Sequence, residues 1–328
     1  MGETTIGTEP TTRARILAAV AVGVLSALAV LFVHDRIPGL RTDFDQVWFA
    51  AKAMLEGHDP YPLIGPTGEF WYGWKFFYPL SAPVSILPLG LLPLLWARVV
   101  FCALSGALLA YLVTREGWYR LSLFLAPPYL LHLVWLQWSV LLVCGLFVPW
   151  LGWFGAVKPN LGAAYFLAQV QWRRAARYAA IGMVPVVASL LVQPAWPYGW
   201  MASMREYVHG APTVMLPGGF LLLIALLRWR RWEGRLFLAL VCFPQTPGAM
   251  SALPLLLIPK TLQGMLILAL LGFASRGMVP FFLPADDTLV PNIRQIALMT
   301  MWTCYFPALY YLLRLPTREE PTARPAEH

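Results

Sequence analysis

The sequence predicts an all-α, polytopic membrane protein, and its composition leads to this fold class. Charged residues are 12% of the 328-residue chain, whereas the apolar set AVILMFWYC reaches 59%. Soluble proteins carry roughly 25% charged residues. The 24 basic residues, mostly arginine, exceed the 16 acidic ones and give a net charge of +8. So few charges cannot cover a soluble fold of this length. The same composition excludes a collagen, a disordered chain and a disulfide-stapled secreted domain.

The basic excess indicates membrane orientation and no nucleic-acid partner. Cytoplasmic loops of membrane proteins collect Arg and Lys, and the basic–aromatic run at residues 228–232 lies between two apolar segments. We interpret this run as a cytoplasmic anchor with interfacial Trp. The four cysteines lie inside apolar runs without metal-site spacing and are expected to be small core residues. They are Cys102, Cys144, Cys242 and Cys304.

The first apolar run predicts an uncleaved signal anchor. Residues 16–33 are uninterrupted, follow Arg13 and Arg15, and lack a small-x-small cleavage pattern. With these arginines inside, residues 1–13 are expected to form a cytoplasmic tail and residues 34–93 an extracytoplasmic loop. This loop is rich in acidic side chains.

The whole chain, residues 1–328, is expected to form one integral membrane domain with about ten crossings, since a crossing needs about 20 residues. Residues 158–177, with basic residues at both ends, are too short for one. There we expect a re-entrant or broken pair that keeps both ends cytoplasmic, and residues 315–328 form a second cytoplasmic tail. After the anchor, crossings are expected near residues 94–113, 121–136, 138–157, 179–192, 216–227, 236–246, 252–258, 262–282 and 293–313.

The extracytoplasmic loop begins with a predicted amphipathic helix. Between positions 44 and 55 apolar residues recur at steps of three and four, the spacing of one helix face. Asp43 is well placed as its N-cap, and a Gly and a Pro stop it. We expect this helix to lie flat on the outer membrane surface and to present one or two carboxylates near the lipid headgroups. An aromatic loop around the single cation Lys75 follows it.

Three motifs in this loop carry a family resemblance. The spacing D-F-x-x-x-W-x-A-A-x-A-x-L-x-G-x-x-P-Y runs from Asp43 to Tyr61. F-x-Y-P then ends at Pro79, and P-L-x-x-L-P ends at Pro93. Together they resemble the start of glycosyltransferase family 87.

That family consists of polyprenol-phosphate-mannose-dependent mannosyltransferases of the GT-C superfamily. Weaker likeness continues at residues 137–142, 158–162 and 244–248. The resemblance implies a GT-C-like helical bundle in the cell's inner membrane, with an active site facing the extracytoplasmic side. The partners that it implies are a polyprenyl-phosphate sugar donor, a glycan or glycolipid acceptor and membrane lipids.

The resemblance assigns catalysis to Asp43, which opens the motif. Inverting transfer needs a general base for the acceptor hydroxyl proton, and cations must neutralise the departing polyprenyl phosphate. Lys75, Arg98 and Arg41 are the candidate cations; Arg98 is the sharpest, because a charge just inside a membrane helix is expensive unless it faces a cavity. No cofactor or metal is implied, and dependence on a divalent cation stays open. The remaining substrate-binding candidates are Asp45, His58, Tyr61, Tyr78, Gln137 and Gln245.

Each assignment has a structural alternative. Asp43 also fits a helix cap, and Asp45 fits a solvated carboxylate better than a metal-binding D-x-D pair, because no nucleotide-binding fold accompanies it. Lys75 and Arg98 fit interfacial anchors. Lys158 is best interpreted as a helix stop with a cytoplasmic cation, away from an outer active site.

Two further functions stay open. Broken, Pro-rich helices fit a lipid or glycolipid transporter, which the concentration of acidic groups on one face disfavours. A catalytically silent membrane subunit that assists another transferase is the third reading. A transporter moves intact lipid without forming a glycosidic bond, and a silent subunit binds the lipid carrier without turnover.

Overall fold

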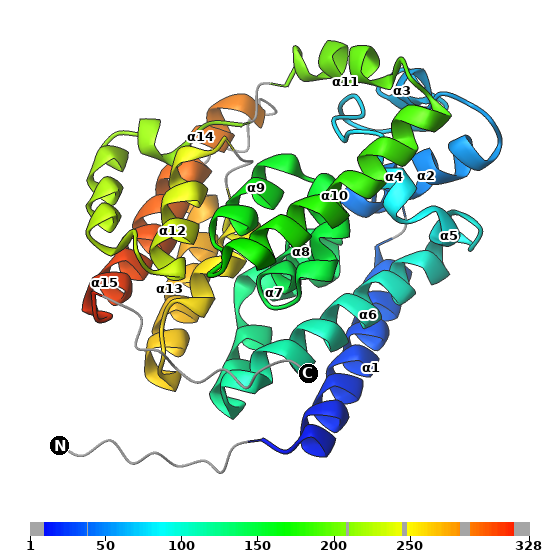
Figure 1. The fold of residues 1–328 in the computed structure, drawn as a ribbon. Coiled ribbons are helices and arrows are strands. Elements are labelled where there is room, and N and C mark those ends of the chain that lie inside the picture. The colour runs from blue at the N-terminus through cyan, green and yellow to red at the C-terminus, as the bar shows by residue number, and fades with distance from the viewer. Residues whose placement is uncertain (1–9, 38, 208–209, 245–247, 283–288, 318–328) are drawn as a thin grey trace.

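The computed structural model describes residues 10–37, 39–207, 210–244, 248–282 and 289–317 as a helical assembly (Figure 1). The first half contains α1 (Thr12–Arg36), α2 (Asp43–Leu55), α3 (Pro60–Leu63), α4 (Ser81–Ser85), α5 (Leu87–Gly90), α6 (Leu94–Val113), η1 (Thr114–Glu116), η2 (Trp118–Leu125), α7 (Pro127–Trp135), α8 (Ser139–Val143), η3 (Cys144–Leu146) and η4 (Pro149–Ala156). A short parallel pair, β1 (Ile64–Gly65) and β2 (Phe70–Trp71), lies between α3 and α4. The second half contains α9 (Pro159–Leu167), α10 (Trp172–Val192), α11 (Trp196–Met204), η5 (Thr213–Met215), η6 (Gly219–Arg228), α12 (Trp232–Cys242), η7 (Ala249–Leu257), α13 (Leu262–Phe282), α14 (Leu289–Thr300), the π-helix η8 (Met301–Tyr305) and α15 (Phe306–Arg314).

The predicted helical membrane class is confirmed at this coarse level. Within the described residues, four helices are long and apolar enough to cross a membrane: Thr12–Arg36, Leu94–Glu116, Trp172–Val192 and Arg294–Arg314. The first two contain the predicted runs 16–33 and 94–113. The predicted number of about ten crossings is not confirmed, because four helices of the described residues have the required length and apolarity.

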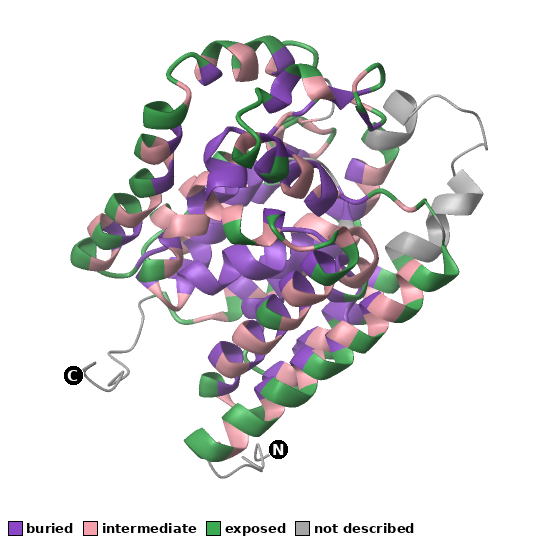
Figure 2. Ribbon diagram, turned by 90° about the vertical axis from the view of Figure 1, so that its right-hand side faces the viewer, coloured by how far each residue is buried: buried purple, intermediate pink, exposed green. Residues whose placement is uncertain are grey.

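The crossings expected at residues 121–136 and 138–157 are wrong as continuous helices. Two short elements replace the first and three replace the second, because Pro127, Pro128 and Pro149 interrupt the backbone ladder of any longer helix. Such broken segments are tolerated at membrane depth where protein surrounds them. Figure 2 shows the buried residues concentrated in the middle of the molecule, and every residue of α8 is buried.

Helices α1 and α6 lie side by side and antiparallel (Figure 1). At one end the Arg15 guanidinium donates to the backbone carbonyl of Tyr111 at 2.7 Å, and the Arg115 guanidinium lies 5.7 Å from the centre of the Tyr111 ring. At the other end Arg98 Nη1 contacts His34 Nδ1 at 3.0 Å. We name these the arginine end and the Asp43 end, since α2 begins beside Arg98.

Residues 149–167 form a hairpin that does not cross the bundle. Its two arms are η4 and α9, and its base is closed where Gln169 Nε2 donates to Gly145 O at 3.0 Å. At the far end, Ser81 Oγ of α4 donates to Ala156 O at 2.9 Å, so Lys158 lies at the tip, toward the Asp43 end. The predicted re-entrant or broken pair over residues 158–177, with both ends on one side, is therefore wrong: the hairpin consists of η4 and α9, and Lys158 lies at its turn, at the opposite end from Gln169.

The Asp43 end is capped by α2–α5 and α11, which lie together in Figure 1. The apolar face of α2 packs against protein: a Cβ on Gly90 of α5 would lie 3.2 Å from Ala51, and Trp48 Nε1 donates to Leu92 O at 3.1 Å. Helix α11 rests on α3 in the same way, with Gly199 against the Tyr61 ring. The helices α4 and α5 therefore cover the apolar stripe of α2.

Candidate active site

Asp43 is the first residue of α2, and its carboxylate is not used to cap the helix. The cap position is Thr42, whose backbone N–H donates to Asp45 Oδ2 at 2.7 Å. Asp45 thus supplies the acidic half of a capping box. The alternative that Asp43 is only an N-cap is therefore wrong, and its side chain remains available for other contacts.

Four side chains from three separate segments converge on the Asp43 carboxylate. Tyr72 donates to Oδ1 at 3.2 Å, and Gln137 Nε2 donates to Oδ2 at 2.7 Å. Tyr78 makes a longer contact with Oδ2 at 3.5 Å, and Lys158 Nζ lies 3.6 Å from the same oxygen. The carboxylate thus has donated hydrogens and a positive charge around it. Because the Asp43 side chain is still 26% exposed, an incoming hydroxyl can reach it.

Lys158 is the site residue that the sequence reasoning placed wrongly. Its Nζ lies 3.2 Å from Gln137 Oε1 as well as near Asp43, and 5.6 Å from the centre of the Tyr78 ring. The hairpin explains this position, since Pro159 starts α9 directly after the tip. The K-P-N match at residues 158–160 indicates a position in the site. The positive-inside rule instead predicts a cytoplasmic lysine here.

The phenols of Tyr72 and Tyr78 remain protonated donors. Burial raises the pKa of Tyr72, and the negative charge of Asp43 raises it further. The same two causes, in the same order, hold the pKa of Tyr78 well above its usual value. Both phenols therefore keep their hydrogens for Asp43 across the neutral range. Tyr72 was not among the sequence candidates, because one tyrosine in an aromatic loop gives no distinguishing signal.

Arg98 and Asp45 form a buried pair instead of facing substrate. Arg98 Nε donates to Oδ1 of Asp45 at 2.8 Å and Nη2 to Oδ2 at 2.6 Å, and Asp45 is fully buried. Arg98 Nη2 also donates to Leu40 O at 2.9 Å. The expectation of a solvated Asp45 is therefore wrong. Arg98 has its charge neutralised inside the protein, which removes the reason to place it on the donor phosphate.

Lys75 also differs from its predicted environment. Its Nζ lies 2.6 Å from Glu206 Oε1 after α11, and both side chains are about half exposed. It therefore links the aromatic loop to the segment after α11. Among the described residues, Lys75 does not contact Asp43.

Replacing Lys75 by alanine is expected to leave the protein close to wild type. Exposed ion pairs contribute about 0–1 kcal/mol, and the contacts around Asp43 do not include this residue. Thermal denaturation in detergent should move by no more than a few degrees, with Glu206→Gln as the matched control. A fall in the denaturation midpoint of Lys75→Ala much larger than that of Glu206→Gln would contradict this expectation.

The remaining candidates divide by exposure. Tyr61 is buried and donates to Tyr78 O at 3.1 Å, so it supports the site from behind. Arg41 is exposed and stacks on Phe70 at 4.5 Å, with no carboxylate partner among the described residues. His58 is exposed at the end of α2, and Gln245 lies outside the described residues.

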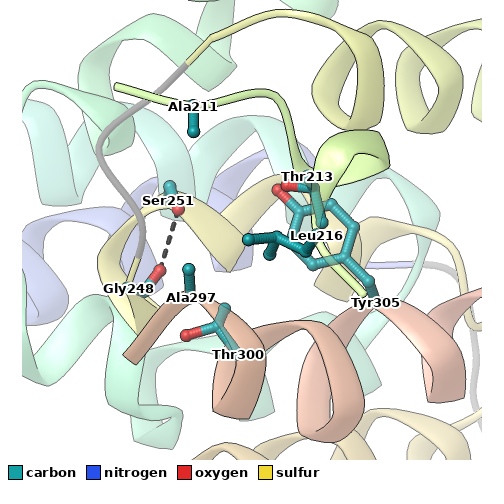
Figure 3. Close-up of a pocket in the computed structure, with 8 residues that line it drawn as sticks. All are labelled: Ala211, Thr213, Leu216, Gly248, Ser251, Ala297, Thr300 and Tyr305. Carbon is teal, nitrogen blue, oxygen red and sulfur yellow. Dashed lines mark hydrogen bonds between the residues drawn. The ribbon is translucent and has the colours of Figure 1, made fainter. Parts of the chain in front are cut away.

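In the described part of the chain, no three His, Cys, Asp or Glu side chains lie together as metal ligands would. Figure 3 shows a cavity among Thr213, Ser251, Thr300 and Tyr305, separate from the Asp43 cluster. Its volume is about 20 Å³, enough for about one water molecule. It is too small for a sugar.

Comparison with known proteins adds no assignment: no protein-family model, no curated protein and no solved structure matches the chain. The chemistry of the site is therefore inferred from its own side chains. The site combines one partly exposed carboxylate, a lysine shared between that carboxylate and an amide, and two neutral phenols. Such a set can accept a proton and stabilise an anion at adjacent positions.

Proposed function

We propose that the chain is an inner-membrane glycosyltransferase, with Asp43 as the general base of an inverting transfer. The donor is a polyprenyl-phosphate sugar, and the family resemblance of the first-loop motif makes mannose the preferred sugar. The acceptor is a glycan or glycolipid on the extracytoplasmic side. The observation that carries the proposal is the convergence of Lys158, Gln137 and Asp43 at the end of the bundle opposite the arginine end.

The proposed reaction follows from these atoms. Asp43 Oδ2 accepts the proton of the acceptor hydroxyl while the oxygen of that hydroxyl forms a bond to the anomeric carbon. The bond from that carbon to the phosphate oxygen breaks, and the polyprenyl phosphate leaves with its electron pair. Lys158 offsets the charge that develops on the phosphate. Arg41, which has no carboxylate partner in the described chain, lies two residues before Asp43 and is the second cation proposed for this role.

The orientation of the site is part of the proposal. Arg15 and Arg115 meet at the end remote from Asp43, and loops rich in arginine are retained in the cytoplasm. The Asp43 end then faces the extracytoplasmic side, where lipid-linked donors of this kind replace nucleotide sugars. A single phosphate can be neutralised by side chains alone, so the reaction as proposed runs without a metal.

The function is tested with a radiolabelled polyprenyl-phosphate mannose. Membranes that contain the chain should transfer label to an endogenous or added glycan, and membranes without it should not. If intact donor crosses sealed vesicles and no glycosidic bond forms, the chain is a transporter. If purified chain binds the lipid carrier but never turns over, it is a silent subunit.

Exchanging Lys158 for methionine is expected to raise the KM for the lipid donor about 10- to 100-fold. A hydrogen bond to a charged group contributes about 1.5–3 kcal/mol, and methionine keeps most of the volume without the charge. Steady-state kinetics with the labelled donor measure the change. Lys52→Met is the matched control, since Lys52 lies on the exposed face of α2, 3.9 Å from Glu56. An unchanged donor KM in Lys158→Met would remove Lys158 from the phosphate site.

A further inference from the structure

Gln137 follows an unusual turn between α7 and α8. Leu136 adopts a left-handed conformation with φ 46°, which residues other than glycine and asparagine rarely adopt. Its N–H donates to His132 O at 2.8 Å, which ends α7. A left-handed Leu persists only where the surroundings hold it. The next residue is Gln137, whose side chain bridges Asp43 and Lys158.

The His132 ring closes the same turn from the other side. Its Nδ1 lies 2.7 Å from Gln137 O, and the ring is completely buried. Because a carbonyl only accepts, Nδ1 carries the hydrogen and Nε2 is the acceptor. Nε2 lies 3.3 Å from Ser105 Oγ and 3.4 Å from Cys102 Sγ on α6. Both ring nitrogens are therefore engaged, one by α6 and one by the backbone of the site residue.

We propose that His132 is a positioning residue that holds Gln137, and through Gln137 the carboxylate of Asp43 and the ammonium of Lys158, in reacting geometry. The ring fixes the carbonyl of Gln137 and the His132 carbonyl fixes the N–H of Leu136, so one residue clamps the turn at two points. The clamp is anchored to α6. This inference rests on the proposed function for its catalytic consequence, but the geometry that it describes can be measured separately.

Three substitutions at this position distinguish positioning from packing. In His132→Asn the side-chain amide nitrogen occupies the place of Nδ1 and can still donate to Gln137 O. In His132→Gln the amide reaches the place of Nε2 and leaves that carbonyl unpaired. His132→Phe keeps the ring and its packing against Phe101 and Tyr129 but loses both hydrogen bonds. A packing role ranks Phe as the best replacement, whereas a positioning role ranks Asn as the best.

The experiment measures transfer from labelled polyprenyl-phosphate mannose by wild type, the three variants and Gln137→Ala. We expect His132→Gln and His132→Phe to lose about 10- to 100-fold in kcat and also to raise the donor KM, because Lys158 is displaced with Gln137, and His132→Asn to recover most of both. We also expect His132→Gln to add no loss in the Gln137→Ala background, because both changes remove one function. Phe as the best replacement, or additive losses, would overturn the inference while the transferase function stands.

A structural measurement covers the remaining outcomes. In His132→Gln, and in His132→Asn as its control, an experimental structure reports the φ of Leu136 and the Gln137–Asp43 distance. We expect both to change in the first variant and to persist in the second. Leu136 unchanged near 46° and Gln137 still 2.7 Å from Asp43 in His132→Gln would overturn the inference even in a chain that transfers no sugar. If wild type itself is inactive, only the proposed function fails. If His132→Gln does not fold, inactivity of a folded His132→Asn variant overturns the inference.

Discussion

Asp43→Asn is expected to reduce sugar transfer about a hundred- to ten-thousandfold, the range that a positioned general base contributes. Asparagine keeps the size of the side chain and an oxygen for the Tyr72 hydrogen bond, which is 3.2 Å long in the wild type. It cannot accept the hydroxyl proton. The loss should therefore appear in kcat, with the donor KM similar to that of wild type. Single-turnover transfer from radiolabelled donor measures it.

The controls for this result come from the same helix. Glu56→Gln changes an exposed acid at the other end of α2, 3.9 Å from Lys52, and is expected to transfer sugar like wild type. Asp43→Glu keeps the charge but moves the carboxylate by one methylene, so an intermediate rate is expected. Equal transfer by wild type and Asp43→Asn would remove Asp43 from the catalytic role.

The parts of the fold that the sequence predicts are those with strong local signals. Helices α1, α2 and α6 follow from unbroken apolar length or from three- and four-residue spacing. Residues 121–157 carry apolar runs that predict two crossings, but proline breaks the helices there and neighbouring protein surrounds the short pieces that result. An apolar run that is buried in protein looks the same in a sequence as one that crosses lipid.

The site could be predicted only in part. Asp43, Tyr78 and Gln137 were named from the family motifs and do lie together. Lys158 was missed because a cation after an apolar run reads as cytoplasmic, and the hairpin that turns it toward Asp43 is a tertiary feature. His132 carries no sequence signal at all.

Asp45 and Arg98 show the opposite error. The sequence predicts a separate binding role for each of them, but their pairing depends on how α2 packs against α6. Sequence reasoning gives each residue a separate role, whereas the structure gives them one shared role. They join the start of α2 to α6 and, through the contact of Arg98 with His34, to α1. The first residue of α2 is Asp43, so this pair also sets where the carboxylate lies.

Arg98→Met is expected to destabilise the protein by about 3–5 kcal/mol, because it leaves the buried charge of Asp45 unpaired. That is a large part of the roughly 5–15 kcal/mol that most domains have. Asp45 would keep the Thr42 N–H as a donor but lose two hydrogen bonds from the guanidinium. Chemical or thermal denaturation in detergent measures the change, and sugar transfer should fall with it as α2 loses its anchor.

The double variant Arg98→Met with Asp45→Leu separates a buried charge from a needed contact. Replacing both partners of a buried ion pair by apolar residues is often neutral or stabilising, so we expect it to recover most of the stability that Arg98→Met loses. Transfer should recover less, because the pair also orients the start of α2 through the Thr42 N–H. The exposed pair Lys52–Glu56 is the control, and its Lys52→Ala variant should lose no more than about 1 kcal/mol. If Arg98→Met proves as stable as Lys52→Ala, the pair is not the anchor of α2, and the position of Asp43 must depend on its contacts with Gln137, Tyr72 and Lys158 alone.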